Sequence, residues 1–310
     1  MQRRDFFKMG FAVGAAFSLD NLSGLFPAAE AAEPSPPSPQ GRPALVAVRG
    51  GSRTAMLDAA LTALGGIGAF VRPGQNVVIK PNCAWDKAPE MGANTHPELV
   101  GHMVKLCREA GAARVAVFDH SCDAWQRVYR TSGIREAVEQ NGGDMLTGDD
   151  EAMYRDHENP QARNLKRARV HEAILDADVY INMPVLKHHS GARMTGCMKN
   201  AMGLVWDRGF FHSHDLHQCI ADSLLLRRPD LNVLDAFAPM LRNGPKGKDE
   251  NDLIATRALL AGTDVVAIDA AASKLLGNKE GEVRHIELAA GMGLGEKDLS
   301  KVAIRRITLA

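Results

Sequence analysis

Basic and imidazole side chains are concentrated in one segment of the chain, between Met183 and Gly203. Lys187, His189 and Lys199 all lie in this segment. Histidine titrates near neutrality and burial lowers the pKa of lysine, so a lysine–histidine pair suits proton transfer beside a carboxylate or a phosphate. We therefore predict that Lys187, His189 and Lys199 are catalytic.

The same segment has the composition of an anion-binding site. Lys187, Arg193 and Lys199 bring positive charge close to a helix that is expected to begin at Thr195. Free N–H groups and the helix dipole favour a phosphate or a carboxylate at such a helix end. The alternative is that these lysines are solvated or form ion pairs with Asp119 and Asp235. The predicted anion-binding residues are Lys80, Asn82, Asp119, Arg193, Thr195 and Asn200.

Three histidines a short distance downstream predict a metal site. His212, His214 and His217 have the spacing H-x-H-x-x-H, and Asp215 lies between the last two. Imidazole together with carboxylate suits zinc, iron or nickel, so we predict that the three rings are ligands of a divalent metal. A histidine-rich surface loop is the alternative interpretation.

The five cysteines do not support an iron–sulfur cluster ligated by cysteines, because none of them forms a C-x-x-C pair. Cys197 lies next to the predicted anion site. It is either a reactive thiol, if nearby positive charge lowers its pKa, or a buried small residue. We favour the buried residue.

Short apolar runs alternate with amphipathic segments along the chain, which predicts an α/β fold with a largely parallel sheet and helices on both faces. Such sheets bind ligands beyond the C-terminal ends of their strands. The polar residues Lys80, Asn82 and Asp119 all lie at the ends of expected strands. Strands are expected at 44–49, 77–80, 115–118, 144–146, 179–183, 231–235, 257–261 and 302–309, and helices at 54–64, 95–110, 133–140 and 263–276.

Two local features complete this prediction. Thr95 is expected to cap the helix that it begins, with Glu98 returning the bond three residues later. Residues 149–169 are polar and without periodicity, so we expect an irregular excursion on the surface.

The N-terminus has the features of a twin-arginine export signal. Arg3 and Arg4 begin the pattern R-R-x-F-x-K, an apolar run follows at 9–17, and residues 29–31 offer an A-x-A cleavage site. We therefore predict that the twin-arginine translocase exports this protein to the periplasm. A retained membrane anchor is disfavoured, because a spanning helix needs about 20 apolar residues.

These features divide the sequence into three parts. We predict a signal peptide at 1–31, a proline-rich linker at 32–42 and a single α/β domain at 43–310. After the signal, no stretch is long and apolar enough to cross a membrane. Lys plus Arg and Asp plus Glu both number 37, and this zero net charge predicts no nucleic-acid partner.

The motifs of the chain resemble those of the domain of unknown function 362 family. Ile79–Asn82 matches its I-K-P-N block, and Thr95–Glu98 matches T-x-P-E. Many members of that family carry an added ferredoxin-like module with four-cysteine iron–sulfur motifs, which this sequence lacks. The family name records that the activity is unknown. The residues that match its main signature are Asp178, Val179, Asn182, Pro184, Lys187, His189, Thr195, Gly196, Lys199, Asn200 and Gly203.

Two functions remain open from the sequence. The first is an exported enzyme, assisted by a metal or another cofactor, that acts on a small carboxylate or phosphate. The second is a periplasmic protein without catalysis that binds a ligand or metal, or that helps a partner enzyme to mature. Both would have the same binding site.

Overall fold

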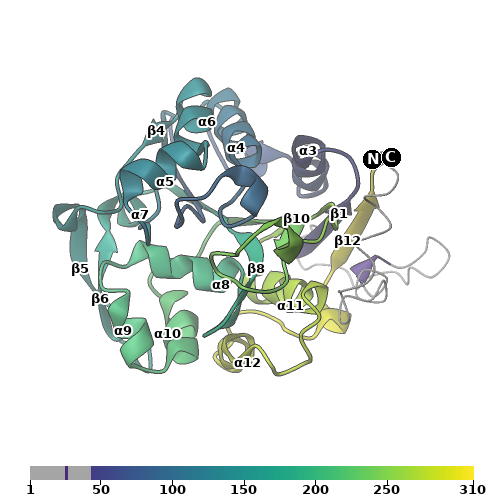
Figure 1. The fold of residues 1–310 in the computed structure, drawn as a ribbon. Helices are drawn as coiled ribbons and strands as arrows, with labels where there is room; N and C mark the ends of the chain where they lie inside the picture. The colour runs from purple at the N-terminus through teal and green to yellow at the C-terminus, as the bar shows by residue number, and fades with distance from the viewer. Residues whose placement is uncertain (1–24, 27–42) are drawn as a thin grey trace.

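A large, mostly parallel sheet runs through the part of the chain that the computed structural model describes, residues 25–26 and 43–310 (Figure 1). Within these residues its main path follows the order β12–β1–β11–β10–β7–β2–β3–β4. Strand β11 is antiparallel to both neighbours, and the other pairs along this path are parallel. The strands are β12 (Ile304–Thr308), β1 (Leu45–Arg49), β11 (Ala258–Gly262), β10 (Leu231–Met240), β7 (Val179–Met183), β2 (Asn76–Pro81), β3 (Arg114–Val117) and β4 (Asp144–Met145).

Two further strands extend the sheet away from this path. β8 (Val185–His189) pairs parallel with β10, and β9 (Arg193–Thr195) pairs antiparallel with β8. The predicted catalytic residues Lys187 and His189 therefore lie within a strand, which the sequence did not predict. A strand fixes the backbone of both residues by ladder hydrogen bonds.

Helices cover both faces of the sheet, as predicted (Figure 1). Successive residues of a strand point to opposite faces. In β2, Val77 and Ile79 pack into one core and Val78 packs into the other. The first core includes side chains of α3 (Arg53–Ala63), α4 (Pro97–Glu109), α5 (Trp125–Thr131) and α6 (Ile134–Gln140). The second includes α7 (Glu172–Leu175), α8 (Cys197–Asn200), α9 (Gly209–Ser213), α10 (Leu216–Ser223), α11 (Val265–Leu275) and α12 (Arg284–Gly291).

Three local predictions are wrong. Residues 149–169 are not irregular, because they include β5 (Tyr154–Glu158), which pairs antiparallel with β6 (Arg167–His171). Thr95 does not cap α4; its hydroxyl donates to the carbonyl oxygen of Met183 at 2.6 Å and accepts from the N–H of Asn82. Helix α8 begins at Cys197 rather than at Thr195.

The predicted signal (1–31) and linker (32–42) lie outside the described residues, with the exception of Leu25 and Phe26. Both of these side chains are buried, and the Nε of Arg306 donates to the carbonyl oxygen of Leu25 at 2.8 Å. Among the described residues, no helix has the length and apolar character needed to span a membrane.

The connections around β2 define where a ligand crevice belongs. The chain leaves β2 for β3 on one side, and it returns later to place β7 on the other side. In open parallel sheets, ligands bind beyond the C-terminal ends of the strands where the winding reverses in this way. Lys80 and Asn82 lie at this end of β2.

Candidate functional site

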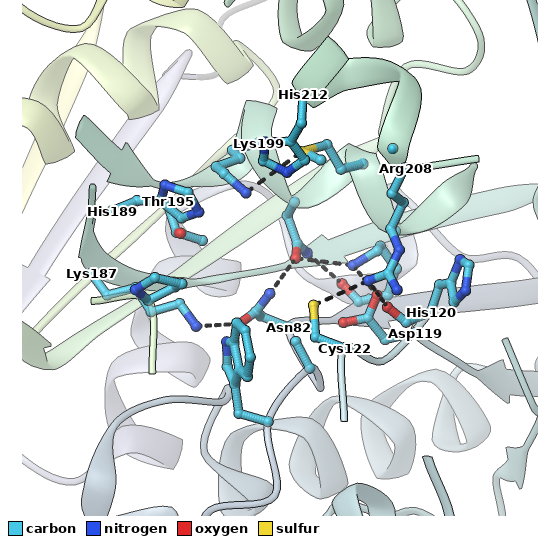
Figure 2. Close-up of a pocket in the computed structure, with 18 residues that line it drawn as sticks. Asn82, Asp119, His120, Cys122, Lys187, His189, Thr195, Lys199, Arg208 and His212 are labelled. Atoms are coloured by element: carbon cyan, nitrogen blue, oxygen red, sulfur yellow. Dashed lines mark hydrogen bonds and ion pairs between the residues drawn. The ribbon is translucent and has the colours of Figure 1, made fainter. Parts of the chain in front are cut away.

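A pocket of about 420 Å³ opens at the C-terminal ends of β2 and β3 (Figure 2). Most of the predicted site residues line it, although they come from distant parts of the sequence. These are Lys80, Asn82, Asp119, Lys187, His189, Thr195, Lys199, Asn200 and His212. The sheet therefore brings the I-K-P-N segment and the Met183–Gly203 segment to one cavity.

Lys80 and Asp119 form a buried ion pair at the floor of the pocket. The Lys80 Nζ lies 2.7 Å from the Asp119 Oδ1, and the two side chains are 1% and 3% exposed. The other carboxylate oxygen of Asp119 accepts from the N–H of Cys83 at 2.7 Å. Burial lowers the pKa of Lys80, and the attraction of Asp119 opposes this change. The predicted alternative, in which a lysine pairs with Asp119, is therefore correct for Lys80.

Lys187 is buried and has only neutral hydrogen-bond acceptors among the described residues. Its Nζ donates to Asn82 Oδ1 at 2.7 Å and to the carbonyl oxygen of Ala93. Burial, with a smaller contribution from Lys199, lowers the pKa of Lys187 to about 7. This amine therefore exchanges a proton near neutral pH, which suits a general acid or base.

Lys199 reaches the same pocket from helix α8. Its Nζ contacts the Met202 Sδ at 3.5 Å, a weak acceptor, and forms no ion pair with a carboxylate among the described residues. Burial lowers the pKa of Lys199 to about 8. Lys199 is thus the pocket amine with the least protein compensation for its charge.

The start of α8 is not available to an anion, in contrast to the prediction. The buried carboxylate of Asp269 already accepts from the N–H groups of Cys197 and Met198, at 2.6 and 2.9 Å. Burial raises the pKa of Asp269 to about 7. Anion binding in this pocket therefore depends on side-chain cations and not on the dipole of α8.

His189 presents one ring nitrogen to the pocket. Its Nδ1 accepts from the N–H groups of Gly191 and Ala192, both at 3.1 Å, so the ring proton belongs on Nε2. Burial, followed by the charges of Lys199 and Lys187, lowers the pKa of His189 to about 2. We therefore expect a neutral ring at physiological pH, which donates a hydrogen bond through Nε2 and does not supply a positive charge.

Asn200 connects the two segments that form the pocket. Its Oδ1 accepts from Lys80 Nζ at 3.0 Å and from Asn82 Nδ2 at 3.2 Å, and its own Nδ2 donates to Asn182 Oδ1 at 2.9 Å. Each of these amides uses both its donor and its acceptor, so rotation of any one would disrupt its neighbours. The network fixes Asn82, which in turn holds Lys187.

Gly203 leaves room for the buried ion pair, and this gives a testable prediction. A Cβ atom at this position would lie 2.1 Å from Asp119 Oδ1 and 2.6 Å from Lys80 Cε. Gly203→Ala must therefore separate the pair, and we expect the free energy of unfolding to fall by about 1–3 kcal/mol. Urea denaturation measures this change.

Gly291→Ala is the matched control for this prediction. Position 291 closes helix α12, and an added Cβ would meet nothing within 4 Å. Alanine is the better helix former, so this variant should be as stable as the wild type or slightly more stable. A Gly203→Ala variant with the stability of Gly291→Ala would show that the ion pair does not need this space.

Arg193 and two of the three predicted metal ligands do not reach the pocket. Arg193 is exposed, and it begins β9 with a φ of 66°. His214 stacks on Phe210 with ring centroids 3.8 Å apart, and the Nδ1 of His217 lies 3.1 Å from the Nδ1 of His285. No group of three His, Cys, Asp or Glu side chains able to hold a metal occurs in 25–26 and 43–310. The predicted histidine cluster is therefore not formed, and of its three members only His212 lines the pocket.

Arg208 and Cys122 also line the pocket, although neither was predicted from the sequence as a site residue. The Arg208 guanidinium donates to the carbonyl oxygens of His120 and Ser121, both at 2.8 Å, and to the Cys122 Sγ at 3.2 Å. Arg208 follows no predicted strand and belongs to no family motif that we used. Only the position of Cys122 after the strand at 115–118 could have indicated its role.

The prediction that Cys197 is a buried residue is confirmed. Its side chain is fully buried, and burial raises the pKa of its thiol well above the ordinary value. A protonated, inaccessible thiol is not nucleophilic.

Comparisons with known proteins place this chain in a family. A thylakoid-associated protein of Synechocystis sp. is 29% identical over 235 residues, which is 71% of this chain and 68% of that protein. The lactate racemase apoprotein from Thermoanaerobacterium thermosaccharolyticum has a similar structure, with 11% identity, a TM-score of 0.40 and coverage of 71% of this chain. A Thermotoga maritima protein gives 10% identity, a TM-score of 0.44 and coverage of 77%. The chain spans only 55% and 59% of these two structures.

The resemblance inferred from the motifs is confirmed. The family described as Domain of unknown function (DUF362) matches residues 77–274, a range that contains every side chain assigned above to the pocket. The chain therefore belongs to the DUF362 family.

Proposed function

We propose that this protein is an enzyme that binds a small carboxylate or phosphate in the pocket between Lys187 and Lys199 and transfers a proton to or from it. The main support for this proposal is the environment of the two amines. Both line one cavity, and neither has a carboxylate partner among the described residues. We retain export to the periplasm as part of the proposal, on the basis of the N-terminal signal.

The charges of the pocket favour an anion. Asp119 is the one acidic residue among the described residues that line it, and Lys80 neutralises this carboxylate. Lys187, Lys199 and Arg208 remain as further basic groups. A buried charge without a partner is unfavourable. An ion pair between an anion and these groups is therefore more favourable in the pocket than in water.

The roles of the two amines follow from their environments. Lys199, with a pKa of about 8, is mostly protonated near neutral pH and would hold the anion. Lys187, with a pKa of about 7, is present in both forms and would give or take the proton. The neutral His189 would donate a hydrogen bond through Nε2. The near-neutral pKa of Lys187 favours an enzyme over the alternative of a binding or maturation protein, because binding alone needs no such group.

The pH dependence of anion binding tests this proposal. Lys187 and Lys199 are charged well below their pKa values of about 7 and about 8, and they lose their protons above them. Affinity for acetate or sulfate, whose charges are constant in this range, should therefore be high at about pH 6 and fall at least tenfold by about pH 10. Isothermal titration calorimetry of the full chain measures this change. Equal affinity at both pH values, or no binding at either, would overturn the proposal.

A further inference from the structure

Cys122 is the one exposed cysteine among the described residues, and it lines the pocket. It follows Asp119 in the loop after β3, so the sheet places it at the same edge as Lys80. Cys83, Cys107, Cys197 and Cys219 are buried. Only Cys122 combines access to solvent with a position beside the basic groups of the pocket.

The sulfur is held in place by its own loop and by Arg208. The N–H of Cys122 donates to the carbonyl oxygen of Ala84 at 2.9 Å, and Arg208 Nη1 donates to the Sγ at 3.2 Å (Figure 2). Arg208 also holds the carbonyl oxygens of His120 and Ser121. A guanidinium donor therefore fixes the position of an exposed sulfur at the edge of the pocket.

The two pocket amines lie in the same cavity as this sulfur, because Lys187 and Lys199 line it together with Cys122. His189, only 9% exposed, lines the same pocket, and its Nε2 has no hydrogen-bond partner within the described part of the chain. A bound molecule would therefore meet a sulfur, two amines and a free ring N–H.

We propose that Cys122 is a nucleophile of this pocket, which forms a covalent bond to an electrophilic carbon of an anion held by Lys187 and Lys199. This inference rests on the proposed function, because the anion must first bind. It adds a substrate class, namely small carboxylates or phosphates with a displaceable group on a nearby carbon.

The step is a displacement at carbon. The Cys122 thiol first gives its proton to solvent. The thiolate electron pair then forms the S–C bond, the bond from that carbon to the leaving group breaks, and the leaving group departs with the bonding pair. Lys187 in its protonated form can donate a proton to the leaving group. No oxidant or reductant takes part.

Alkylation by two matched reagents tests this inference. Iodoacetate and iodoacetamide undergo the same displacement and differ in charge. For each thiol, the measured quantity is the ratio of its rate with iodoacetate to its rate with iodoacetamide. In the full chain, under reducing conditions near pH 7, we expect this ratio to be at least about tenfold higher for Cys122 than for free cysteine. Peptide mass spectrometry follows the modification of Cys122 with time. Saturating sulfate should remove this preference.

The variants separate this inference from the proposed function. Lys199→Met should lose the preference for iodoacetate but keep reaction with iodoacetamide, and Lys105→Met, which removes an exposed lysine of α4, should behave as wild type. If Cys122 reacts faster than free cysteine with iodoacetamide but shows no preference for iodoacetate, the anion site is wrong. If acetate binds with the expected pH dependence but Cys122 reacts no faster than free cysteine with either reagent, the assignment of Cys122 as a nucleophile is wrong.

Discussion

Asp119→Asn is expected to lower the free energy of unfolding by about 3–5 kcal/mol, the usual cost of removing one partner from a buried ion pair. The substitution keeps an oxygen that can accept from the Cys83 N–H, but it removes the charge that compensates Lys80. Lys80 is 1% exposed, so water cannot replace the lost carboxylate. Urea denaturation near pH 7 measures the change.

Asp144→Asn provides a control with the same chemistry on the surface. The Asp144 carboxylate lies 2.7 Å from Arg114 Nε, the same separation as in the buried pair, but both side chains are more than half exposed. Exposed pairs of this kind contribute about 0–1 kcal/mol. Similar small losses in both variants would contradict the role of the buried pair.

Lys199→Met is expected to weaken acetate binding about tenfold to a hundredfold, the effect of one charge-assisted hydrogen bond. Methionine fills similar space, but it has no charge and no donor for the anion. The same substitution at Lys187 should have a comparable effect and should also remove the component of the pH dependence near pH 7. Calorimetry at about pH 6, where both amines of the wild type are charged, gives the comparison.

The control for this experiment is Lys105→Met, because Lys105 is 56% exposed on α4 and pairs with Glu109. It changes the net charge by the same amount without touching the pocket. If it weakens binding as much as Lys199→Met does, the effect comes from overall charge and not from the proposed site.

The sequence predicts the sheet well, because most of its strands are short apolar runs buried on both faces. Val77 and Ile79 on one face and Val78 on the other are an example. It fails for residues 149–169, where β5 has an exposed, polar sequence and is defined only by pairing with β6. It also fails for β8, because Lys187 and His189 interrupt the apolar pattern of that strand.

For the site, the sequence identifies residues that follow strands but not those positioned by tertiary contacts. Lys80 lies near the C-terminal end of β2 and Asn82 follows this strand, so their convergence with Lys187 could be predicted from the parallel sheet. Arg193 has a suitable charge, but it begins β9 with a positive φ and its side chain is exposed. The role of Cys122 depends on Arg208, 86 residues away, and no local pattern indicates that contact.

The most direct test of the account is to titrate the two amines themselves. Nuclear magnetic resonance of the lysine side chains, assigned with the Lys187→Met and Lys199→Met variants, follows each group with and without saturating sulfate. We predict midpoints of about 7 for Lys187 and about 8 for Lys199 in the free protein, and higher values for both with the anion bound. Midpoints at the ordinary lysine value of 10.5, or values that sulfate does not change, would contradict an anion site built on two lysines without carboxylate partners.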